Sequence, residues 1–283
     1  MIIQKLNLHI RKLLSENLGL NLREAEIESR FILEHVLRVN HDYLIKNYSQ
    51  LVEANKLKKI MKCASDRISH KPLAYIFKEW KFYDMEFYIN PNVLIPRQDT
   101  ELLVDLIIEK YDKQKKIDIL DLGAGSGAIG IVLGNKFKNA NILLSDISLN
   151  AINIAKKNIL RHKLKNISVI QSDWFSNIPK KKFDVIVSNP PYINKSDPHL
   201  QNKGLLYEPQ DALVSEQDGY ADILEIIKVS PRFLKPNGTL YIEHGYSQHK
   251  KIHQLFLDNN FKKIKQNKDL NGIIRATSGK INI

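Results

Sequence analysis

From residue 117 onward, short apolar runs alternate with longer segments of helical periodicity, and this alternation constrains the fold more than any other feature. Strands separated by helical segments form parallel sheets whose faces are covered by those helices. The pattern therefore predicts an α/β fold with a mostly parallel sheet. The predicted strands are residues 117–122, 141–146, 167–171, 183–188, 238–243 and 273–277, and the predicted helices are 129–137, 149–162, 219–233 and 247–259.

The first 95 residues have a different pattern, which predicts two further parts. Apolar residues recur at helical spacing over residues 3–70, and Asn21 followed by Glu24 has the spacing of a capping box. Short polar links between these helices favour a small bundle. Aromatic residues on both sides of Asp84 then indicate a two-stranded hairpin. The predicted organisation is a helical bundle at 1–70, a hairpin linker at 71–95 and an α/β domain at 96–283.

The composition is that of an ordinary globular chain with an excess of positive charge. Of 283 residues, 43% are hydrophobic, and a single cysteine, Cys63, excludes an internal disulfide framework. Because no run of about 18 apolar residues and no apolar N-terminal segment is present, we expect a cytoplasmic protein without a membrane span or signal peptide. The net charge of +12 can attract nucleic acid or an acidic protein, although the abundance of Lys, Ile and Asn favours a compositional origin.

The first strand of the α/β part ends in a glycine-rich turn. Glycine at every second position lets the backbone approach a ligand closely and adopt dihedrals that other residues avoid. The turn lacks the Gly-Lys-Ser/Thr ending of a P-loop, and its spacing fits the dinucleotide fingerprint only when shifted toward Gly130. The turn is therefore a candidate ligand-binding segment, made of Gly123, Ala124, Gly125, Ser126 and Gly127.

Acidic and aromatic residues follow the next two predicted strands. Asp146 ends the second strand, where its carboxylate can accept hydrogen bonds from both hydroxyls of a ribose. Asp173 and Trp174 follow the third strand, and a carboxylate beside an indole suits an adenine ring. Each residue alone is better explained as a helix cap or a core aromatic, but three such strand ends in succession favour an adenosine-containing cofactor. Since no lysine accompanies the turn to anchor a phosphate, the predicted cofactor is S-adenosylmethionine.

The tetrapeptide Asn189-Pro190-Pro191-Tyr192 follows the fourth strand and stops it, because proline has no N–H to donate to a sheet. Alone, it is equally well explained as a rigid turn. Beside a methyl donor, the Asn189 side-chain oxygen and the Pro190 carbonyl can accept both hydrogens of an –NH₂ group and orient its lone pair for an in-line displacement. They also stabilise the positive charge that grows on the nitrogen. The Tyr192 ring can pack against a planar substrate group.

The loop before a further predicted helix, at 102–110, carries one more candidate. Arg97 lies just ahead of the helix start, and Thr100 or Asp99 can cap the helix. The sequence leaves a binding role for Arg97 and simple solvent exposure equally open.

Over essentially its whole length, the chain resembles the N5-glutamine methyltransferases that modify peptide chain release factors. The tetrapeptide itself is shared with nucleic-acid amino-methyltransferases, and the flanking segments separate the two groups. These segments are Leu94-Ile95-Pro96-Arg97, residues 121–127, Gln171-Ser172-Asp173-Trp174-Phe175, Val187-Ser188 before the tetrapeptide and Ile193 after it, Asp197-Pro198-His199-Leu200, Tyr207-Glu208-Pro209, Ala212-Leu213, Glu243-His244-Gly245 and residues 269–275.

The resemblance implies a Rossmann-like class I methyltransferase domain, with a mostly parallel seven-stranded sheet, preceded by a small all-helical domain. It implies methyl transfer from S-adenosylmethionine to the side-chain amide of the glutamine in the Gly-Gly-Gln motif of release factors. Cofactor contacts are expected from residues 123–127, Asp146, Asp173, Trp174 and Asn189, and substrate contacts from residues 189–192 with Arg97. The helical domain is expected to help bind the protein substrate, and we expect a monomer without a metal ion, a membrane or a stable nucleic-acid partner.

Two departures from the family pattern bear on the rigidity of the linker and the orientation of the domains. Gln98 replaces a proline, and Lys78 or Glu79 stands where a glycine is common. Two other functions stay open at this point. A DNA or RNA amino-methyltransferase would flip a base into the same pocket, with Tyr192 stacked on it. A non-catalytic ribosome- or RNA-binding protein would keep the fold without turnover and bind with a steep salt dependence.

Overall fold

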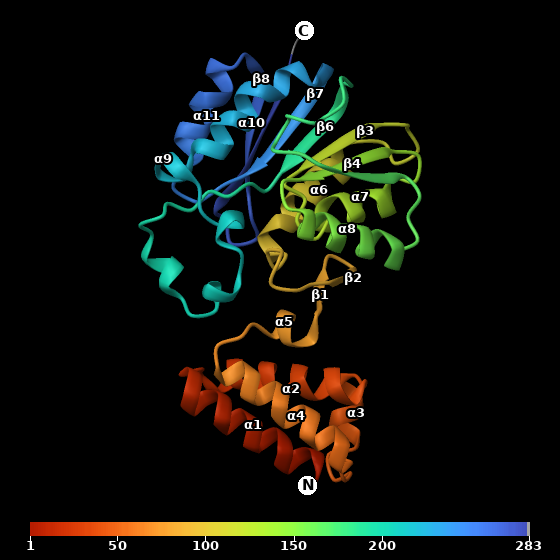
Figure 1. Cartoon of the computed structure of the whole chain (residues 1–283), viewed down its shortest axis with the longest axis vertical. Helices are drawn as coiled ribbons and strands as arrows, with labels where there is room; N and C mark the ends of the chain where they lie inside the picture. The colour runs from red at the N-terminus through yellow and green to blue at the C-terminus, as the bar shows by residue number, and fades with distance from the viewer. Residues whose placement is uncertain (282–283) are drawn as a thin grey trace. The chain divides into compact units, whose positions relative to one another are not determined.

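The computed structural model describes residues 1–281, which form two compact units. The first unit holds Met1–Lys78 and Asn202–Tyr207, and the second holds Glu79–Gln201 and the chain from Glu208 onward. Figure 1 colours the chain from the red N-terminal helices to the blue C-terminal strands. The segment predicted as a linker at 71–95 is divided between the two units, because the first unit ends at Lys78. No helix in the described part of the chain is long and apolar enough to span a membrane.

The first unit is helical, as the spacing of its apolar residues predicts. The apolar face of its first helix is buried at Leu6, Ile10 and Leu14. The predicted capping box is confirmed, since the Asn21 side chain accepts from the Glu24 N–H at 2.9 Å and Glu24 accepts from the Asn21 N–H at 3.1 Å. Its helices are α1 (Ile3–Leu18), α2 (Leu22–Leu37), α3 (His41–Lys46), α4 (Ala54–Ile68) and α5 (Leu73–Phe77).

The second unit contains a seven-stranded sheet and a separate hairpin. The hairpin pairs β1 (Glu79–Phe82) with β2 (Met85–Tyr88) and confirms the prediction around Asp84. The strand order of the sheet is β5-β4-β3-β6-β7-β9-β8, parallel from β5 to β7 and antiparallel at β9 and β8. The strands are β3 (Asp118–Leu122), β4 (Asn141–Asp146), β5 (Ile167–Gln171), β6 (Phe183–Ser188), β7 (Leu234–Glu243), β8 (Phe261–Lys268) and β9 (Ile274–Ile281).

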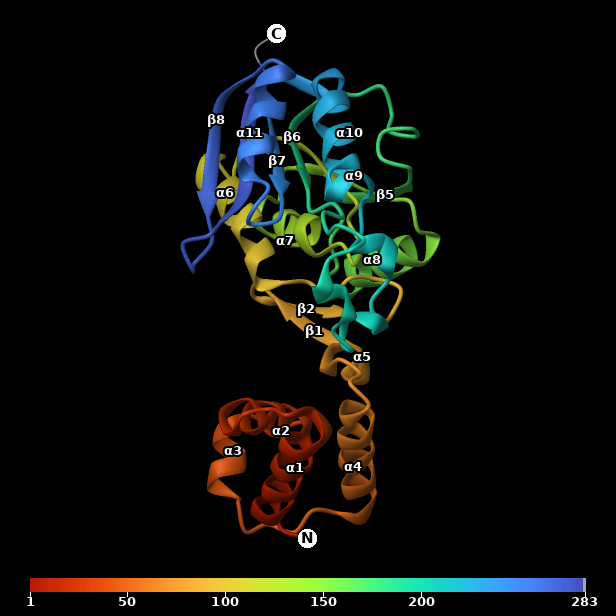
Figure 2. The ribbon, with the colours of Figure 1, turned by 90° about the vertical axis from the view of Figure 1, so that its left-hand side faces the viewer.

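Helices cover both faces of this sheet, as expected for a mostly parallel sheet. Helices α6, α7 and α8 lie on one face, and α10 and α11 lie on the other (Figures 1 and 2). Between the sheet and α10–α11 lies a buried apolar cluster that includes Leu120, Ile186, Leu240 and Phe256. The helices are α6 (Glu101–Lys110), α7 (Ala128–Lys136), α8 (Leu149–Arg161), the short α9 (Glu216–Gly219), α10 (Ala221–Val229) and α11 (His249–Asp258).

The sequence prediction differs from the sheet in three strands. Strand β9 runs from Ile274 to Ile281, whereas the strand predicted there covers only 273–277. Strand β8 was missed, because its four lysines hide the apolar alternation; lysines are typical of an edge strand, where they oppose pairing with other chains. Strand β7 begins at Leu234 rather than at 238, because Pro236, Asn237 and Gly238 have the composition of a turn. The pairing with β6 shifts register there, so these residues form an irregularity within the strand.

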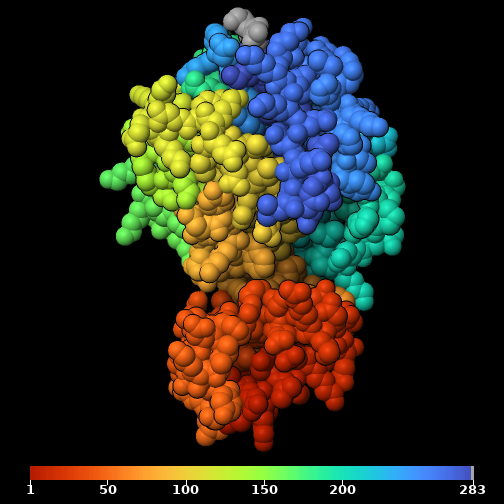
Figure 3. All heavy atoms as spheres, turned by 180° about the vertical axis from the view of Figure 1, so that it is seen from behind, coloured from red at the N-terminus to blue at the C-terminus, as the bar shows by residue number. Residues whose placement is uncertain are grey.

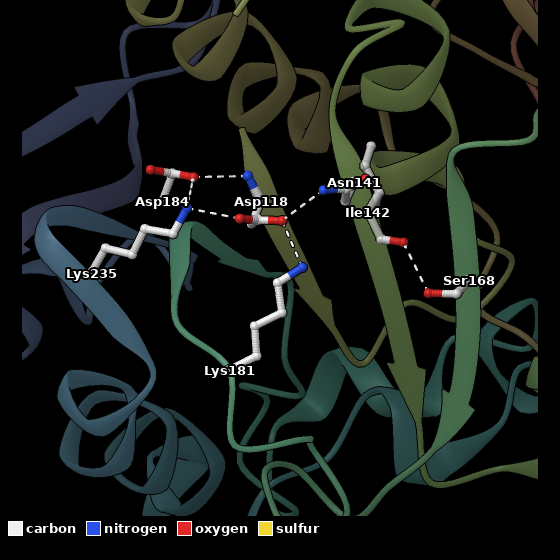
Figure 4. A network of polar contacts seen from close by, with 7 residues as sticks. All are labelled: Asp118, Asn141, Ile142, Ser168, Lys181, Asp184 and Lys235. Carbon is white, nitrogen blue, oxygen red and sulfur yellow. Dashed lines mark hydrogen bonds and ion pairs between the residues drawn. The ribbon is translucent and has the colours of Figure 1, made fainter. Parts of the chain in front are cut away.

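An ion-pair network joins the strands at the amino-terminal end of the sheet (Figure 4). Asp118 on β3 contacts Lys181 at 2.6 Å and Lys235 at 2.7 Å, and Lys235 also contacts Asp184 on β6 at 2.7 Å. Although burial opposes it, hydrogen bonding from the two lysines holds the pKa of Asp118 well below its ordinary value. This network fastens β3, β6 and β7 at one end and leaves the opposite end, where the parallel strands finish, for the candidate site.

Candidate active site

Apart from Arg97, the candidate residues follow the carboxyl ends of parallel strands, at one end of the second unit's sheet. The chain runs outward from β3 to β4 and β5, then returns to place β6 beside β3. In open α/β sheets, ligands bind at such a change of direction. The two central strand ends are held together by a hydrogen bond from the Ser188 hydroxyl to the Leu122 carbonyl at 2.8 Å. The structure thus brings the glycine turn after β3 next to the tetrapeptide after β6.

The glycine turn adopts the backbone that its sequence predicts. Gly123, Gly125 and Gly127 have φ of 67°, 56° and 82°, in the left-handed region that favours glycine. The Gly125 N–H donates to the Asp146 carboxylate at 2.8 Å, and the other Asp146 oxygen accepts from the Ser148 N–H at 2.9 Å. Each carboxylate oxygen keeps a further lone pair, so Asp146 can still accept from a ligand hydroxyl.

Asp121, just before the turn, is a buried carboxyl whose role the sequence analysis missed. Its Oδ2 accepts from the Gly130 N–H at 2.9 Å, whereas its buried Oδ1 accepts no hydrogen bond from the described residues. Burial raises the pKa of Asp121 to about 7, and the nearby Asp146 charge adds to this effect. A buried carboxylate oxygen without a partner is unfavourable unless protonation or a donor group of a ligand satisfies it.

Trp174 lies against the glycine turn, whereas Asp173 beside it is a surface residue. A Cβ atom at Gly123 would lie 3.3 Å from the indole ring of Trp174, so the ring stands directly over that glycine. The indole N–H donates to Asp222 at 3.0 Å, which fixes the orientation of the ring. Asp173 is exposed to solvent. The structure therefore pairs Trp174 with Gly123 and leaves the Asp173 carboxylate at the surface.

In the tetrapeptide, the orientation of Asn189 is set by Thr100. The Asn189 amide NH₂ donates to the Thr100 hydroxyl at 3.1 Å. Thr100 makes no side-chain cap for α6, so this part of the cap prediction is wrong, and its hydroxyl is used at the site instead. Among residues 1–281, neither Asn189 Oδ1 nor the Pro190 carbonyl accepts a hydrogen bond. The tetrapeptide thus presents two acceptors that the rest of the unit does not occupy.

Behind Thr100 lies Glu243, a second buried carboxyl whose role the sequence analysis missed. It ends β7, only 2% exposed, and its Oε1 accepts from the Tyr192 hydroxyl at 3.2 Å. Burial raises the pKa of Glu243 to about 7, with partial offset from the hydroxyls of Thr100 and Tyr192. Burial, and then the Glu243 charge, also raises the pKa of Tyr192, so the phenol stays protonated and donates. Tyr192 therefore directs its hydroxyl inward.

The main chain of Tyr192 is held from two sides. The Gln248 side chain donates to the Tyr192 carbonyl at 3.1 Å and to the Gly219 carbonyl at 3.1 Å. A Cβ atom at Gly219 would lie 2.3 Å from the Tyr192 carbonyl oxygen, so only glycine fits there. The sequence offers a usable signal for Glu243, because it is an acidic residue at the end of a predicted strand. It offers no signal for the close approach of Gly219 to the Tyr192 carbonyl.

Arg97 pairs with a carboxylate rather than standing free. Its guanidinium donates to Glu208 Oε1 at 2.5 Å, and Glu208 Oε2 accepts from the Ile95 N–H at 3.1 Å. The Glu208 side chain is 3% exposed and that of Arg97 is 36% exposed. Arg97 thus keeps one accessible face while it fastens the loop before α6 to the segment around Glu208.

Comparison with known proteins shows the family to which the chain belongs. Residues 97–219 match the model of the methyltransferase small domain, and residues 9–77 match that of the PrmC N-terminal domain. The chain is 38% identical to the release factor glutamine methyltransferase of Buchnera aphidicola (subspecies Acyrthosiphon pisum), over 90% of this chain and 91% of that protein. It is 36% identical to the same enzyme of Francisella tularensis, over 97% and 98%. The chain belongs to the release factor glutamine methyltransferase family.

Other relatives are longer, and solved structures with lower identity share the fold. The chain is 35% identical to the bifunctional methyltransferase of Rickettsia bellii and spans about half that protein's length, 49%. The ribosomal protein L11 methylase of Lactobacillus delbrueckii matches with a TM-score of 0.50 at 21% identity, over 66% of this chain and 81% of that chain. A 16S rRNA N2 G1207 methyltransferase of T. thermophilus matches with a TM-score of 0.54 at 18% identity, over 72% and 50%. These matches confirm a class I methyltransferase fold behind a helical region.

Proposed function

We propose that this chain transfers a methyl group from S-adenosylmethionine to the side-chain amide nitrogen of the glutamine in the Gly-Gly-Gln motif of peptide chain release factors. The family membership supports this reaction, and one observation carries it. Asn189 Oδ1 and the Pro190 carbonyl are two acceptors, on adjacent residues, that no described residue occupies. Two acceptors match the two hydrogens of a primary amide.

The two acceptors address the main difficulty of the chemistry. An amide nitrogen is a poor nucleophile, because its lone pair is delocalised onto the carbonyl. Holding both of its hydrogens orients the lone pair and stabilises the positive charge that grows on the nitrogen. The hydrogen bond to Thr100 prevents Asn189 from presenting its NH₂ group to the substrate. The proton that the product nitrogen releases is acidic enough to leave without a strong base.

The residues around the glycine turn suit the cofactor. Gly123, Ala124, Gly125, Ser126 and Gly127 would hold it beside their main chain, and S-adenosylmethionine would supply an electrophilic methyl group. The Asp146 lone pairs suit ribose hydroxyls, and the Trp174 ring suits one face of an adenine. The unpartnered Asp121 Oδ1 suits the amino group of the methionine part. Asp173 would reach the adenine only from the surface.

The substrate side of the proposal includes the rest of the tetrapeptide and the helical unit. Pro191 and the exposed part of the Tyr192 ring would contact the glutamine-bearing loop, with Arg97 at its margin. The helical domain predicted at 1–70 would help bind the release factor, and the net charge of +12 would favour an acidic partner. We further propose that the protein acts as a cytoplasmic monomer without a stable nucleic-acid partner.

One incubation tests the proposal. The purified chain is mixed with methyl-labelled S-adenosylmethionine and, in separate reactions, with a release factor, the same factor carrying Gln→Ala in Gly-Gly-Gln, ribosomal RNA and DNA. We expect label only in the unmodified factor, and mass spectrometry should place it on the glutamine side chain. Label in nucleic acid but not in the factor would favour a base-modifying enzyme, and no transfer to any substrate would favour a non-catalytic protein.

A further inference from the structure

On the sheet face that carries α6, the second unit has a groove lined by lysines. Helix α6 packs against β7, and β9 and β8 continue past it in the sheet. Figure 3 shows the yellow surface that includes α6 beside the blue surface of the C-terminal strands. A cavity of about 420 Å³ lies there, which we name the lysine groove. The lining residues that matter below are Lys110, Lys263, Lys265, Lys280, Tyr241 and Ser278.

Strand register gathers these side chains on one face. Tyr241 of β7 lies opposite Ser278 of β9, which in turn lies opposite Lys265 of β8. Lys280 of β9 lies opposite Thr239 of β7. Because directly opposed residues in antiparallel strands point to the same side of a sheet, these residues form a continuous patch.

The positive charges of the lysine groove are not neutralised within the protein. Four lysines and one carboxylate, Glu109, line the groove. None of the four ammonium groups lies within 4.0 Å of a carboxylate of the described residues. Lysines elsewhere in the unit do have such partners, for example Lys235 with Asp118 and Asp184. Like charges held together without a counter-charge repel one another, so an anion in the groove would be stabilised.

The floor of the groove contains a polar atom without a partner. Tyr241 is 2% exposed, and its buried hydroxyl makes no hydrogen bond with the residues described. The Lys110 ammonium lies 5.3 Å from the Tyr241 ring centroid and donates to the Thr239 hydroxyl at 2.8 Å. Burial, together with the charges of Lys280 and Lys265, lowers the pKa of Lys110 to about 8. A buried polar group without a partner is unfavourable unless a ligand or water satisfies it.

We propose that the lysine groove binds an oligophosphate, meaning an anion with two or more adjacent phosphoryl groups. Flexible ammonium groups contact such oxygens as point charges, and the hydroxyls of Ser278 and Tyr241 would add hydrogen bonds. Several lysines around one cavity favour a multiply charged anion over a single carboxylate. This site does not share residues with the candidate active site, and the inference does not depend on methyl transfer.

Titration of the whole chain with inorganic pyrophosphate, followed by calorimetry, tests this inference. The double variant Lys265→Gln, Lys280→Gln removes two groove charges and is expected to weaken binding by at least about tenfold. The matched control is Lys228→Gln, Lys250→Gln, which removes two exposed charges from α10 and α11 on the opposite face of the sheet and is expected to change affinity by no more than about twofold. Thermal unfolding of both variants checks that they fold.

Two further measurements sharpen the result. In NMR of ¹³C-methylated lysines, pyrophosphate should raise the pKa of Lys110 from about 8 toward its ordinary value. A parallel titration with a short single-stranded RNA distinguishes a nucleic-acid backbone from a free oligophosphate. The inference is overturned if the wild type does not bind pyrophosphate, if both double variants weaken binding equally, or if RNA binds and pyrophosphate does not.

Discussion

Glu243 offers a quantitative test of the electrostatics at the site. It is fully buried, and its pKa is raised from the ordinary value of 4.5 to about 7. Replacement by glutamine keeps the shape of the side chain and removes the titration. Between pH 4.5 and 7, the folded state binds more protons at this position than the unfolded state, so the wild type loses stability as the pH rises. Well above pH 7 this loss of stability is complete. Glu243→Gln has no titrating carboxyl at this position, so its stability does not fall with pH for this reason.

The size of the effect follows from the shift in pKa. The change in pKa from 4.5 to about 7 corresponds to about 3 kcal/mol in total, since each pKa unit is worth about 1.36 kcal/mol. The wild type has already lost part of this unfolding free energy at pH 5, since the side chain of Glu243 in the unfolded state is mostly ionised at that pH. Between pH 5 and pH 8, Glu243→Gln should therefore gain about 2 to 3 kcal/mol of unfolding free energy relative to wild type.

Urea unfolding at pH 5 and pH 8, followed by tryptophan fluorescence, measures this gain. Both tryptophans, Trp80 and Trp174, belong to the second unit, so the signal reports the unit that contains Glu243. Glu216→Gln, at an exposed carboxylate of α9, is the control and should show no comparable dependence on pH. An equal stability difference at both pH values, or a variant that loses stability relative to wild type at pH 8, would refute the reasoning.

Two other substitutions test how the tetrapeptide is held. Thr100→Val removes the hydroxyl that orients Asn189, so kcat should fall about tenfold. Cofactor affinity, measured by calorimetry, should stay within about twofold of the wild-type value. The control variant Thr100→Ser keeps a hydroxyl and should retain activity. Gly219→Ala would place a Cβ atom 2.3 Å from the Tyr192 carbonyl oxygen. The matched control is Gly272→Ala, where φ is similar but the space around the new Cβ atom is open. In urea unfolding, Gly219→Ala should lower the free energy of unfolding by about 1–3 kcal/mol more than Gly272→Ala does. Activity equal for Thr100→Val and wild type, or equal stability of the two glycine variants, would contradict these assignments.

Much of the fold could be predicted because the buried strands are short, apolar and regularly spaced. Four of the predicted strands, including the one that ends before Asn189, match the structure to within one residue at each end. Strand β8 could not be predicted in this way, since an edge strand rich in lysine has no apolar alternation to detect. Tertiary pairing with β9, rather than local sequence, decides its structure.

The site shows the same division between local and long-range information. The glycine turn and the tetrapeptide are recognisable because their backbone requirements are local. The partners of Asn189 and Tyr192 are not, since Thr100 and Glu243 lie 89 and 51 residues away along the chain. Arg97 had two open explanations from sequence, and its pairing with Glu208 across 111 residues could be found only from the structure.

The central claim is that Asn189 and the Pro190 carbonyl hold the glutamine amide for methylation. The most direct measurement is single-turnover methyl transfer to a Gly-Gly-Gln release factor by Asn189→Ala, with cofactor affinity measured in parallel by calorimetry. We predict a loss of transfer of at least about a hundredfold, with cofactor affinity largely unchanged. Transfer by the variant at the wild-type rate, with the label on the same glutamine, would contradict the account.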